Sequence, residues 1–338
     1  MSQHDQTTFK ELPWKKQAER LRSLAVEALG NYGISKNATL TLLKHRENAV
    51  FGVEEPEKGD RCALRIHRSG YQTKKSISSE LQWMEALREA GIQTPQPIAG
   101  VDGNLVQTVG VQGVPEPCHC SLLSWVAGNL LTDDNPLASY RLLGQINARF
   151  HKQAKSWRLP QGFERQVWDE EGICGERPLW GHFKDLEALN QEQLALLHQA
   201  REVMLKRLRD YGKGPDRFGL IHADLMSENI IMQDNTPCII DFDDSGFGWF
   251  MYDLATLMTF NVADDNFQAI LDAWVEGYRS EETFSDEDLA ELPTFMVARC
   301  FVGLGWINTR KETPFAQEFT EDIIGLACML SQNLIEAQ

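Results

Sequence analysis

Residues 220–244 constrain the fold of this chain more than any other stretch of its sequence. Two short runs in it, 229–232 and 238–242, are rich in β-branched and other apolar residues, as is typical of strands. Residues 234–237 lie between these runs and consist of Asp, Asn, Thr and Pro, which favour a turn. The stretch is therefore predicted to fold as a β-hairpin.

Three polar residues stand at the ends of this predicted hairpin. Asp224 lies in the loop before the first strand, Asn229 begins that strand, and Asp241 lies where the second strand ends. Phosphoryl transfer needs a carboxylate that orients and deprotonates a hydroxyl, and oxygen ligands that hold Mg²⁺ against the phosphates of ATP. Since a hairpin brings the three side chains together, Asp224 is a candidate catalytic base, and Asn229 and Asp241 are candidate metal ligands.

The spacing of these residues matches the catalytic loop of kinases. His222, Asp224 and Asn229 form H-x-D-x-x-x-x-N, and residues 241–243 (Asp-Phe-Asp) follow at the end of the next strand, where kinases keep a metal-binding aspartate. With residues 252–255 (Tyr-Asp-Leu-Ala), these motifs resemble the aminoglycoside phosphotransferase and choline kinase family. They are most similar to its homoserine-kinase-like and bacterial stress-response kinase members.

The resemblance implies an α+β fold of the protein-kinase-like, two-lobed kind. Residues 1–126 would form an N-terminal lobe with a leading helix, a small antiparallel sheet, one further helix and a hinge. Residues 127–338 would form a larger, mainly helical C-terminal lobe with the catalytic loop and the metal-binding hairpin. In this family Asp253 would brace the catalytic loop. Asp243, where protein kinases have glycine, would either ligate a second metal ion or brace the loop.

The activity implied by the resemblance is an ATP- and Mg²⁺-dependent transfer of a phosphoryl group to the hydroxyl of a small molecule. Two rival functions stay open. A protein Ser/Thr kinase is one, although no recognisable activation segment lies between Asp243 and Asp253. The other is a nucleotide-binding pseudokinase, which intact Asp224, Asn229 and Asp241 argue against. The simplest alternative is an exposed hairpin with acidic turn residues, in which Asp224 only caps a helix.

The N-terminal lobe is predicted from shorter patterns. Helical spacing of apolar residues predicts a helix over 13–30, and two strands are predicted at 40–43 and 49–53. The turn between the strands, 44–48, lies where a kinase folds a loop over the phosphates of ATP, but it contains no glycine. Asn48 and backbone N–H groups are the candidates for phosphate contacts there.

Arg65 and Glu80 are predicted to form an ion pair. Residues 62–67 alternate as in a strand, and Arg65 occupies the position where kinases place a phosphate-binding lysine. A helix that begins at Ser76 puts Glu80 in its first turn, where the kinase plan has the acid that holds this basic residue. A surface arginine on a strand and a solvated glutamate on a helix are the alternatives.

Two more strands, 105–109 and 118–125, complete the predicted sheet and lead into a hinge at 126–128. In the family the adenine lies against the last of these strands. The resemblance therefore implies that Leu123, Ser124 and Trp125 adjoin the nucleotide base.

Regular spacing of apolar residues predicts the helices of the C-terminal lobe. They are expected at 137–150, 190–211, 265–279, 285–310 and 315–336, the first after a capping segment at 132–136. Residues 156–182 show little periodicity and form a long insertion, and residues 245–249 are predicted to be a turn-rich loop because of their Ser and Gly content. His151 is expected to be a packing residue rather than a catalyst.

Charge and cysteine content limit the partners. The formal net charge of −16 disfavours nucleic acid and anionic membrane surfaces as partners. Seven cysteines without framework spacing favour a reducing compartment, and no signal peptide or apolar segment of membrane-spanning length is seen, so a cytoplasmic protein is predicted. Residues 118–120 (Cys-His-Cys) lack a second pair at a zinc spacing and are expected to belong to a strand.

The acceptor and the oligomeric state are not predicted. Between Asp264 and Glu291 there are ten acidic residues and one basic residue, Arg279. This acidity would suit a pocket for an amine-bearing acceptor such as an amino alcohol, a hydroxyamino acid or an aminoglycoside, but a solvated helix face is the more ordinary explanation.

Overall fold

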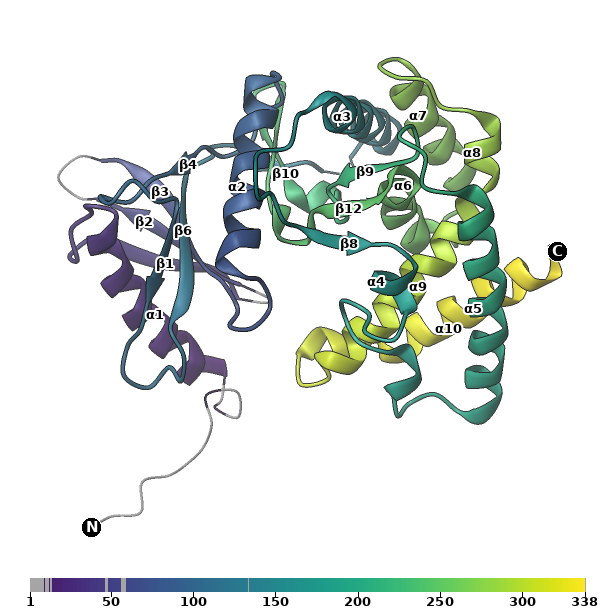
Figure 1. Cartoon of the computed structure of the whole chain (residues 1–338), viewed down its shortest axis with the longest axis horizontal. Helices are drawn as coiled ribbons and strands as arrows, with labels where there is room; N and C mark the ends of the chain where they lie inside the picture. The colour runs from purple at the N-terminus through teal and green to yellow at the C-terminus, as the bar shows by residue number, and fades with distance from the viewer. Residues whose placement is uncertain are drawn as a thin grey trace, which may run out of the picture. The chain divides into compact units, whose positions relative to one another are not determined.

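The structure, a computed structural model, describes residues 9, 12, 14–45, 48–55, 59–132 and 134–337 (Figure 1). The contacts between residues divide the chain into two compact units. The first comprises Met1–Asn129, Pro160–Glu164 and Ile231–Ile240, and the second comprises Leu130–Leu159, Arg165–Ile230 and Asp241–Gln338. The first unit carries the main antiparallel sheet and the second carries most of the helices, as predicted for the α+β fold.

The sheet of the first unit has the strand order β1-β2-β3-β6-β4, and β5 pairs with β6. Its strands are β1 (Thr39–His45), β2 (Ala49–Glu54), β3 (Arg61–Ile66), β4 (Pro97–Ile98), β5 (Val106–Val109) and β6 (Cys118–Ser124). The described pairs between them are antiparallel. The strands predicted at 40–43, 49–53, 62–67, 105–109 and 118–125 are confirmed, with shifts of one or two residues at most ends.

Alternation along the strands builds the core of this unit. On β2, the side chains of Ala49, Phe51 and Val53 are buried while the residues between them are half-buried. They share one apolar cluster with Leu64 of β3 and with Leu24 of α1 (Trp14–Asn31). Burial of one strand face against an amphipathic helix is what the two sequence periods predict.

The second helix of this unit begins earlier than predicted. Helix α2 spans Lys74–Glu89, and the side chain of Thr73 caps it by accepting a hydrogen bond from the Ser76 backbone N–H. Threonine is a favoured capping residue, and the sequence interpretation placed the start two residues too late. As a result Glu80 lies beyond the first turn of the helix.

The predicted hairpin at 229–242 is present but shorter. Strand β10 spans Ile230–Gln233 and β11 spans Thr236–Ile239, with the strand order β11-β10-β7, where β7 is Asn129–Leu130. Asp234 in the two-residue turn has a φ of 55°, which aspartate tolerates better than most residues. Asn229 precedes β10 in a short 3-10 helix, Ser227–Asn229, and Asp241 follows the end of β11.

The helices of the second unit are α3 (Pro136–Ser156), α4 (Glu170–Cys174), α5 (Gln191–Tyr211), α6 (Phe250–Met258), α7 (Phe267–Arg279), α8 (Asp286–Ala290), α9 (Leu292–Thr309) and α10 (Pro314–Glu336). Short 3-10 turns cover Phe183–Asp185, Phe242–Asp244 and Thr259–Asn261. Two of these helices begin with favoured capping residues. Asn135 caps α3, with Pro136 as its first residue, and Asn190 forms a capping box with Gln193 at the start of α5.

The single helix predicted over 285–310 is wrong, because the segment forms two helices. Helix α8 ends at Ala290, and Pro293 stands in the first turn of α9, where proline is tolerated but cannot continue a preceding helix. The rest of α9 is almost entirely buried, and α10 and α6 pack against it.

The turn-rich loop predicted at 245–249 is also wrong. Residues Gly246–Trp249 form strand β12, the central strand of a three-stranded sheet with β8 (Gln166–Trp168) and β9 (Phe218–Ile221). A Cβ on Gly246 would lie 2.4 Å from the Gln166 carbonyl oxygen, so glycine serves close strand packing here rather than a turn.

This small sheet brings the two polar segments of the second unit together. Strand β9 is antiparallel to β12, and its last residue, Ile221, pairs with Gly246, the first residue of β12. The chain therefore leaves β9 and enters β12 at the same edge. The loop that begins at His222 and the acidic turn 241–244 must consequently lie next to each other.

Candidate active site

The loop after β9 is held by a carboxylate beneath it. The backbone N–H groups of His222 and Ala223 donate to the side chain of Asp253 in α6, at 3.3 and 2.7 Å. Ala223 has a φ of 65°, in the left-handed region that alanine rarely adopts. The predicted role of Asp253 as a brace of the catalytic loop is confirmed.

Asp253 is itself fully buried and is fixed from α3. His151 Nε2 lies 3.1 Å from an Asp253 oxygen, and Asn147 Nδ2 donates to the same oxygen at 3.2 Å. Burial lowers the pKa of His151, despite the hydrogen bond and charge of Asp253, which raise it. A neutral His151 that donates through Nε2 accepts a hydrogen bond at Nδ1, where the Tyr278 hydroxyl lies at 2.9 Å. His151 is thus a structural residue, as expected.

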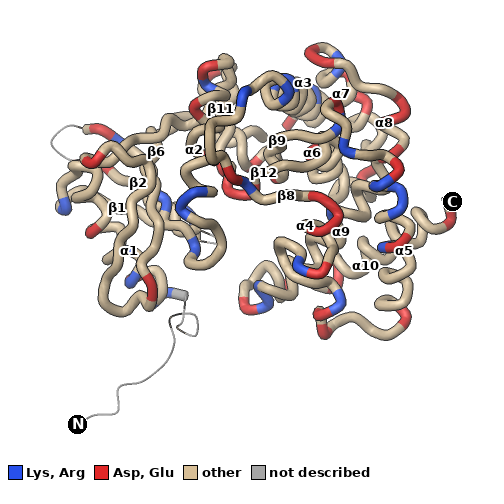
Figure 2. Tube along the Cα trace, in the orientation of Figure 1, with Lys and Arg blue, Asp and Glu red and all other residues tan. Residues whose placement is uncertain are grey.

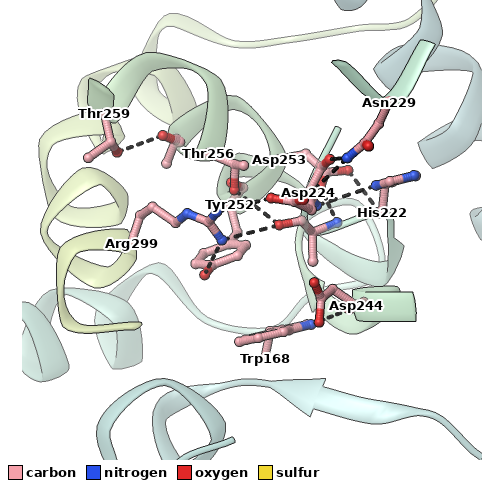
Figure 3. Close-up of polar contacts among 12 residues, drawn as sticks. Trp168, His222, Asp224, Asn229, Asp244, Tyr252, Asp253, Thr256, Thr259 and Arg299 are labelled. Atoms are coloured by element: carbon pink, nitrogen blue, oxygen red, sulfur yellow. Dashed lines mark hydrogen bonds and ion pairs between the residues drawn. The ribbon is translucent and has the colours of Figure 1, made fainter. Parts of the chain in front are cut away.

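Asp224 presents a carboxylate whose two oxygens are held from opposite sides (Figure 3). Asn229 Nδ2 donates to Oδ2 of Asp224 at 3.2 Å and to its backbone carbonyl at 2.8 Å. Arg299 of α9 donates to Oδ1 at 3.0 Å. The Asp224 side chain keeps 23% of its surface exposed, so an incoming hydroxyl has access to it.

The acidic turn 241–244 is organised by its backbone. Asp241 adopts the left-handed conformation, with φ 64° and ψ 60°, and begins a 3-10 turn. The guanidinium of Arg165 donates to the carbonyls of Phe242, Asp243 and Ser245 at 3.2, 2.6 and 2.7 Å. These bonds fix the direction of the turn.

Aromatic packing fixes the same turn to the catalytic loop. Phe242 is fully buried, and its ring centroid lies 4.7 Å from that of His222 and 5.8 Å from that of Phe150. Trp168 Nε1 donates to the carbonyl of Asp244 at 2.8 Å. The Asp243 side chain is buried, whereas Asp241 is half-buried.

The donor set suits a metal ion that is shared with phosphates. Both bonds from Asn229 to Asp224 use Nδ2, so the amide oxygen is directed away from Asp224. Within the described part of the chain, no three His, Cys, Asp or Glu side chains form a group that could hold a metal ion. Mg²⁺ is usually bound by one or two side chains together with substrate phosphates, and Asn229 with Asp241 fits that pattern.

The first unit contains the predicted ion pair. Arg65 NH2 lies 2.5 Å from Glu80 Oε1, and both side chains are buried, at 5% and 0% exposure. The alternatives of a surface arginine and a solvated glutamate are therefore wrong. Arg65 Nε also lies 3.4 Å from the Ser121 hydroxyl on the neighbouring strand β6.

The other nucleotide-binding candidates are also in the first unit. Asn48 is buried, and its side chain accepts a hydrogen bond from the Arg68 backbone N–H at 3.1 Å; residues 46 and 47 of the same predicted turn lie outside the described residues. Ser124 exchanges hydrogen bonds with Gln96, since its backbone N–H donates to the Gln96 carbonyl and its hydroxyl accepts from the Gln96 N–H, each at 2.8 Å.

Leu123 and Trp125 flank this residue. Leu123 pairs with both β3 and β4, and the guanidinium of Arg61 lies 4.0 Å from the centroid of the Trp125 ring. Because the Ser124 N–H is already bonded, a base that lies against this strand would have to use other backbone groups.

Most acidic residues of the segment 264–291 are paired with basic residues. Six of its ten acidic residues form ion pairs with basic residues. In Figure 2, blue and red positions lie interspersed around α3, α5, α7 and α8. The paired acids are Glu276, Glu281, Glu282, Asp286, Asp288 and Glu291. Their partners are on α3, α5 and neighbouring segments, so six of the ten carboxylates are matched by cations of the second unit.

Sequence reasoning missed two arginines of the site, Arg165 and Arg299. Arg165 lies in the aperiodic insertion, where no pattern distinguishes it. Arg299 left a signal, because it is the only charged residue of α9, a helix that is otherwise apolar or uncharged. A lone charge in an apolar helix is almost always paired, and its partner is often functional.

Comparison with known proteins identifies the family. The model of the phosphotransferase enzyme family matches residues 39–292, which is most of the chain. The chain belongs to the phosphotransferase enzyme family. It is therefore an enzyme that phosphorylates a hydroxyl group, and the sequence-based recognition of this family is confirmed.

Curated relatives span most of the chain. An uncharacterized protein of Deinococcus radiodurans is 30% identical over 305 residues, 87% of this chain and 82% of its own length. The amicoumacin kinase of Bacillus subtilis is 27% identical over 299 residues, 83% of each protein.

Solved structures of phosphotransferases have the same fold. A microcompartment-associated aminopropanol kinase is 34% identical with a TM-score of 0.85, covering 93% of this chain and 98% of its own. An amicoumacin kinase solved with AMP-PNP, Ca²⁺ and its antibiotic has a TM-score of 0.76 at 20% identity, covering 95% and 96%. The protein-kinase-like fold predicted for this phosphotransferase is confirmed. No helix in the described residues is long and apolar enough to cross a membrane.

Proposed function

We propose that this phosphotransferase uses ATP and Mg²⁺ to phosphorylate the hydroxyl of an amino alcohol. The carboxylate of Asp224, fixed between Asn229 and Arg299 and still accessible, is the observation that carries the proposal. The choice of acceptor is supported by the aminopropanol kinase, which resembles the chain over nearly its whole length.

In the proposed reaction the acceptor hydroxyl gives its proton to Asp224. The hydroxyl oxygen forms a bond to the γ-phosphorus of ATP as the bond from that phosphorus to the β–γ bridging oxygen breaks, and ADP leaves. The transition state of phosphoryl transfer is loose, so Asp224 contributes chiefly by orienting the hydroxyl. An accurate position is worth more here than a strong base.

Asn229 and Asp241 are the residues that would hold the metal ion. When bound, Mg²⁺ neutralises the negative charge of the phosphates. Burial of the Asp243 side chain favours the bracing role over that of a second metal ligand. Its backbone carbonyl already takes part in the contact with Arg165.

In the first unit, Arg65 would bind the nonreacting phosphates. Glu80 holds the guanidinium through a buried ion pair, and the planar guanidinium of arginine suits phosphate oxygens. Asn48 would support the turn over the phosphates, and the base would lie near Leu123, Ser124 and Trp125.

The test is ADP release by the purified protein with Mg²⁺-ATP across a panel of acceptors. The panel contains aminopropanol, ethanolamine, choline, homoserine, sugars, aminoglycosides and amicoumacin. We expect turnover with an amino alcohol that is lost in Asp224→Asn. The matched control is Asp234→Asn, which removes the same charge from the exposed turn of the hairpin and keeps a residue that tolerates its positive φ.

Other outcomes would identify a different function. Turnover only with an antibiotic would assign the acceptor to the class of the amicoumacin kinase instead. Nucleotide binding without turnover on any acceptor would contradict the proposal and favour a pseudokinase or a protein substrate.

A further inference from the structure

Among the described residues, Arg299 is the basic residue whose side chain donates to the Asp224 carboxylate. Its NH2 group donates to Oδ1 of Asp224 at 3.0 Å, while Asn229 occupies the other oxygen at 3.2 Å (Figure 3). The carboxylate is thus held at both ends by donors from two distant segments of the chain. Rotation about the Cβ–Cγ bond of Asp224 would break both bonds at once.

The position of Arg299 is itself well defined. Its side chain is buried on α9, and its NH1 group lies 3.5 Å from both the Ala223 carbonyl and the Tyr252 hydroxyl. Its guanidinium carbon lies 5.6 Å from the centroid of the Trp180 ring. A planar cation that is packed in this way loses little further entropy when it orients a partner.

The charge of Arg299 is maintained in this setting. Burial acts to lower its pKa, but Tyr252 and Asp224 raise it above the usual value for arginine. Burial raises the pKa of Tyr252 to about 12, so the tyrosine stays a neutral hydroxyl. The guanidinium therefore stays ionised, and hydrogen bonds donated by a charged group are stronger than neutral ones.

Two other roles for Arg299 make different predictions. As a purely structural cation it would contribute to folding and not to turnover. As an anchor for an anionic group of the acceptor it would affect the acceptor KM first. The direct hydrogen bond to the carboxylate that would receive the proton favours a role in turnover.

We propose that Arg299 is a positioning residue that fixes the Asp224 carboxylate in the orientation needed to accept the proton of the acceptor hydroxyl. The inference rests on the proposed function. With Oδ1 held by Arg299 and Oδ2 by Asn229, the plane of the carboxylate is set while part of the side chain stays exposed. Arg299 does not contact the acceptor in this role.

The experiment compares Arg299→Lys and Arg299→Ala with the parent protein, using the best acceptor of the panel. We expect kcat of Arg299→Ala to fall by about 100-fold, the lower end of what a positioned acid or base contributes. The acceptor KM should change little. Arg299→Lys keeps the positive charge but loses the planar guanidinium, so we expect its kcat to lie between those of Arg299→Ala and the parent protein.

Guanidinium ion supplies a readout that a structural role would not give. At concentrations well below those that unfold proteins, it should raise kcat of Arg299→Ala several-fold and leave Asp224→Asn unchanged. Arg310→Ala is the matched control, since Arg310 is also buried near the C-terminal end of α9, with its guanidinium 5.4 Å from the Trp180 ring. We expect Arg310→Ala to keep its kcat and to gain nothing from guanidinium.

Each other outcome would overturn either the positioning role of Arg299 or the proposed function. An unchanged kcat in folded Arg299→Ala, or a raised acceptor KM with normal kcat, would overturn the positioning role and leave the proposed function intact. A loss of kcat that neither lysine nor guanidinium relieves, with a lowered melting temperature, would make Arg299 structural. If the parent protein turns over no acceptor, the proposed function itself fails.

Discussion

At the scale of single residues, the site depends on carboxylates that are satisfied by several donors at once. Asp253 accepts hydrogen bonds from two backbone N–H groups of the catalytic loop and from Asn147, and it lies beside His151. It holds Ala223 in a backbone conformation that alanine avoids. Asp224 is oriented by Arg299 and Asn229 in a comparable way.

Replacing Asp253 tests this arrangement. In Asp253→Asn one carboxylate oxygen becomes an amide NH₂ group, so N–H groups that donate to that oxygen lose their acceptor. Each unsatisfied buried donor costs about 1–3 kcal/mol. We expect the variant to have a lower melting temperature and a kcat reduced at least tenfold, because the loop that carries Asp224 relaxes. Asp265→Asn, on the exposed segment before α7, is the control. Wild-type kcat in a folded Asp253→Asn would show that the loop does not need this brace.

The pair of Arg65 and Glu80 makes a second prediction at this scale. Glu80→Gln leaves a buried guanidinium without its counter-charge, which typically costs about 3–5 kcal/mol. We expect a lower melting temperature and a raised KM for ATP, because Arg65 is no longer held for phosphates. Glu85→Gln removes an exposed charge from the same helix and should change neither. An unaltered KM for ATP in Glu80→Gln would exclude this role of the pair.

At the scale of elements, strand β12 shows how the same residues support two interpretations. Glycine is common in turns, so the sequence of residues 245–249 predicts a loop. In the structure Gly246 and Gly248 allow β12 to lie close to β8 and β9, and only neighbours distant in sequence reveal this. The contact positions the catalytic loop beside the acidic turn, so the glycines serve the site indirectly.

A pair of glycine substitutions tests the element. The added methyl group of Gly246→Ala would overlap the backbone of β8, and overpacking of this kind costs about 1–3 kcal/mol. Gly325→Ala in α10 meets no atom within 4 Å and should stabilise the helix by about 1 kcal/mol. Thermal unfolding should therefore move in opposite directions in the two variants. Equal melting temperatures would mean that β12 packs less closely than described.

For the whole molecule, the sequence predicts local structure better than it predicts contacts between segments that are distant in sequence. The N-terminal strands and the hairpin after Asp224 follow from periodicity and turn residues, and the ion pair of Arg65 and Glu80 follows from the resemblance to kinases. The predicted start of a helix was wrong where the capping residue lies earlier in the chain, as Thr73 does before α2. Arg165 left no signal in the sequence, and the lone charge of Arg299 did not reveal its partner, because each reaches the site only through the packing of the second unit.

Thiol reactivity is a property of the whole chain. Six of the seven free cysteines are buried and only Cys328 is partly exposed. Burial raises the pKa of Cys62 and Cys238 to about 11, and the thiolate is the reactive form. We expect one thiol to react rapidly with a chromogenic disulfide at pH 8 in the native protein, and seven after unfolding. Cys328→Ser should remove the fast phase. Several fast thiols would mean that the core is more open than the structure indicates.

Phosphorus NMR of a reaction that contains the protein, Mg²⁺-ATP and aminopropanol would test directly whether Asp224 serves phosphoryl transfer to a hydroxyl. We expect a phosphomonoester resonance that grows in step with ADP and is absent with Asp224→Asn. Inorganic phosphate as the sole product, or an ester formed equally well by Asp224→Asn, would contradict the assignment of Asp224 as the residue that receives the hydroxyl proton.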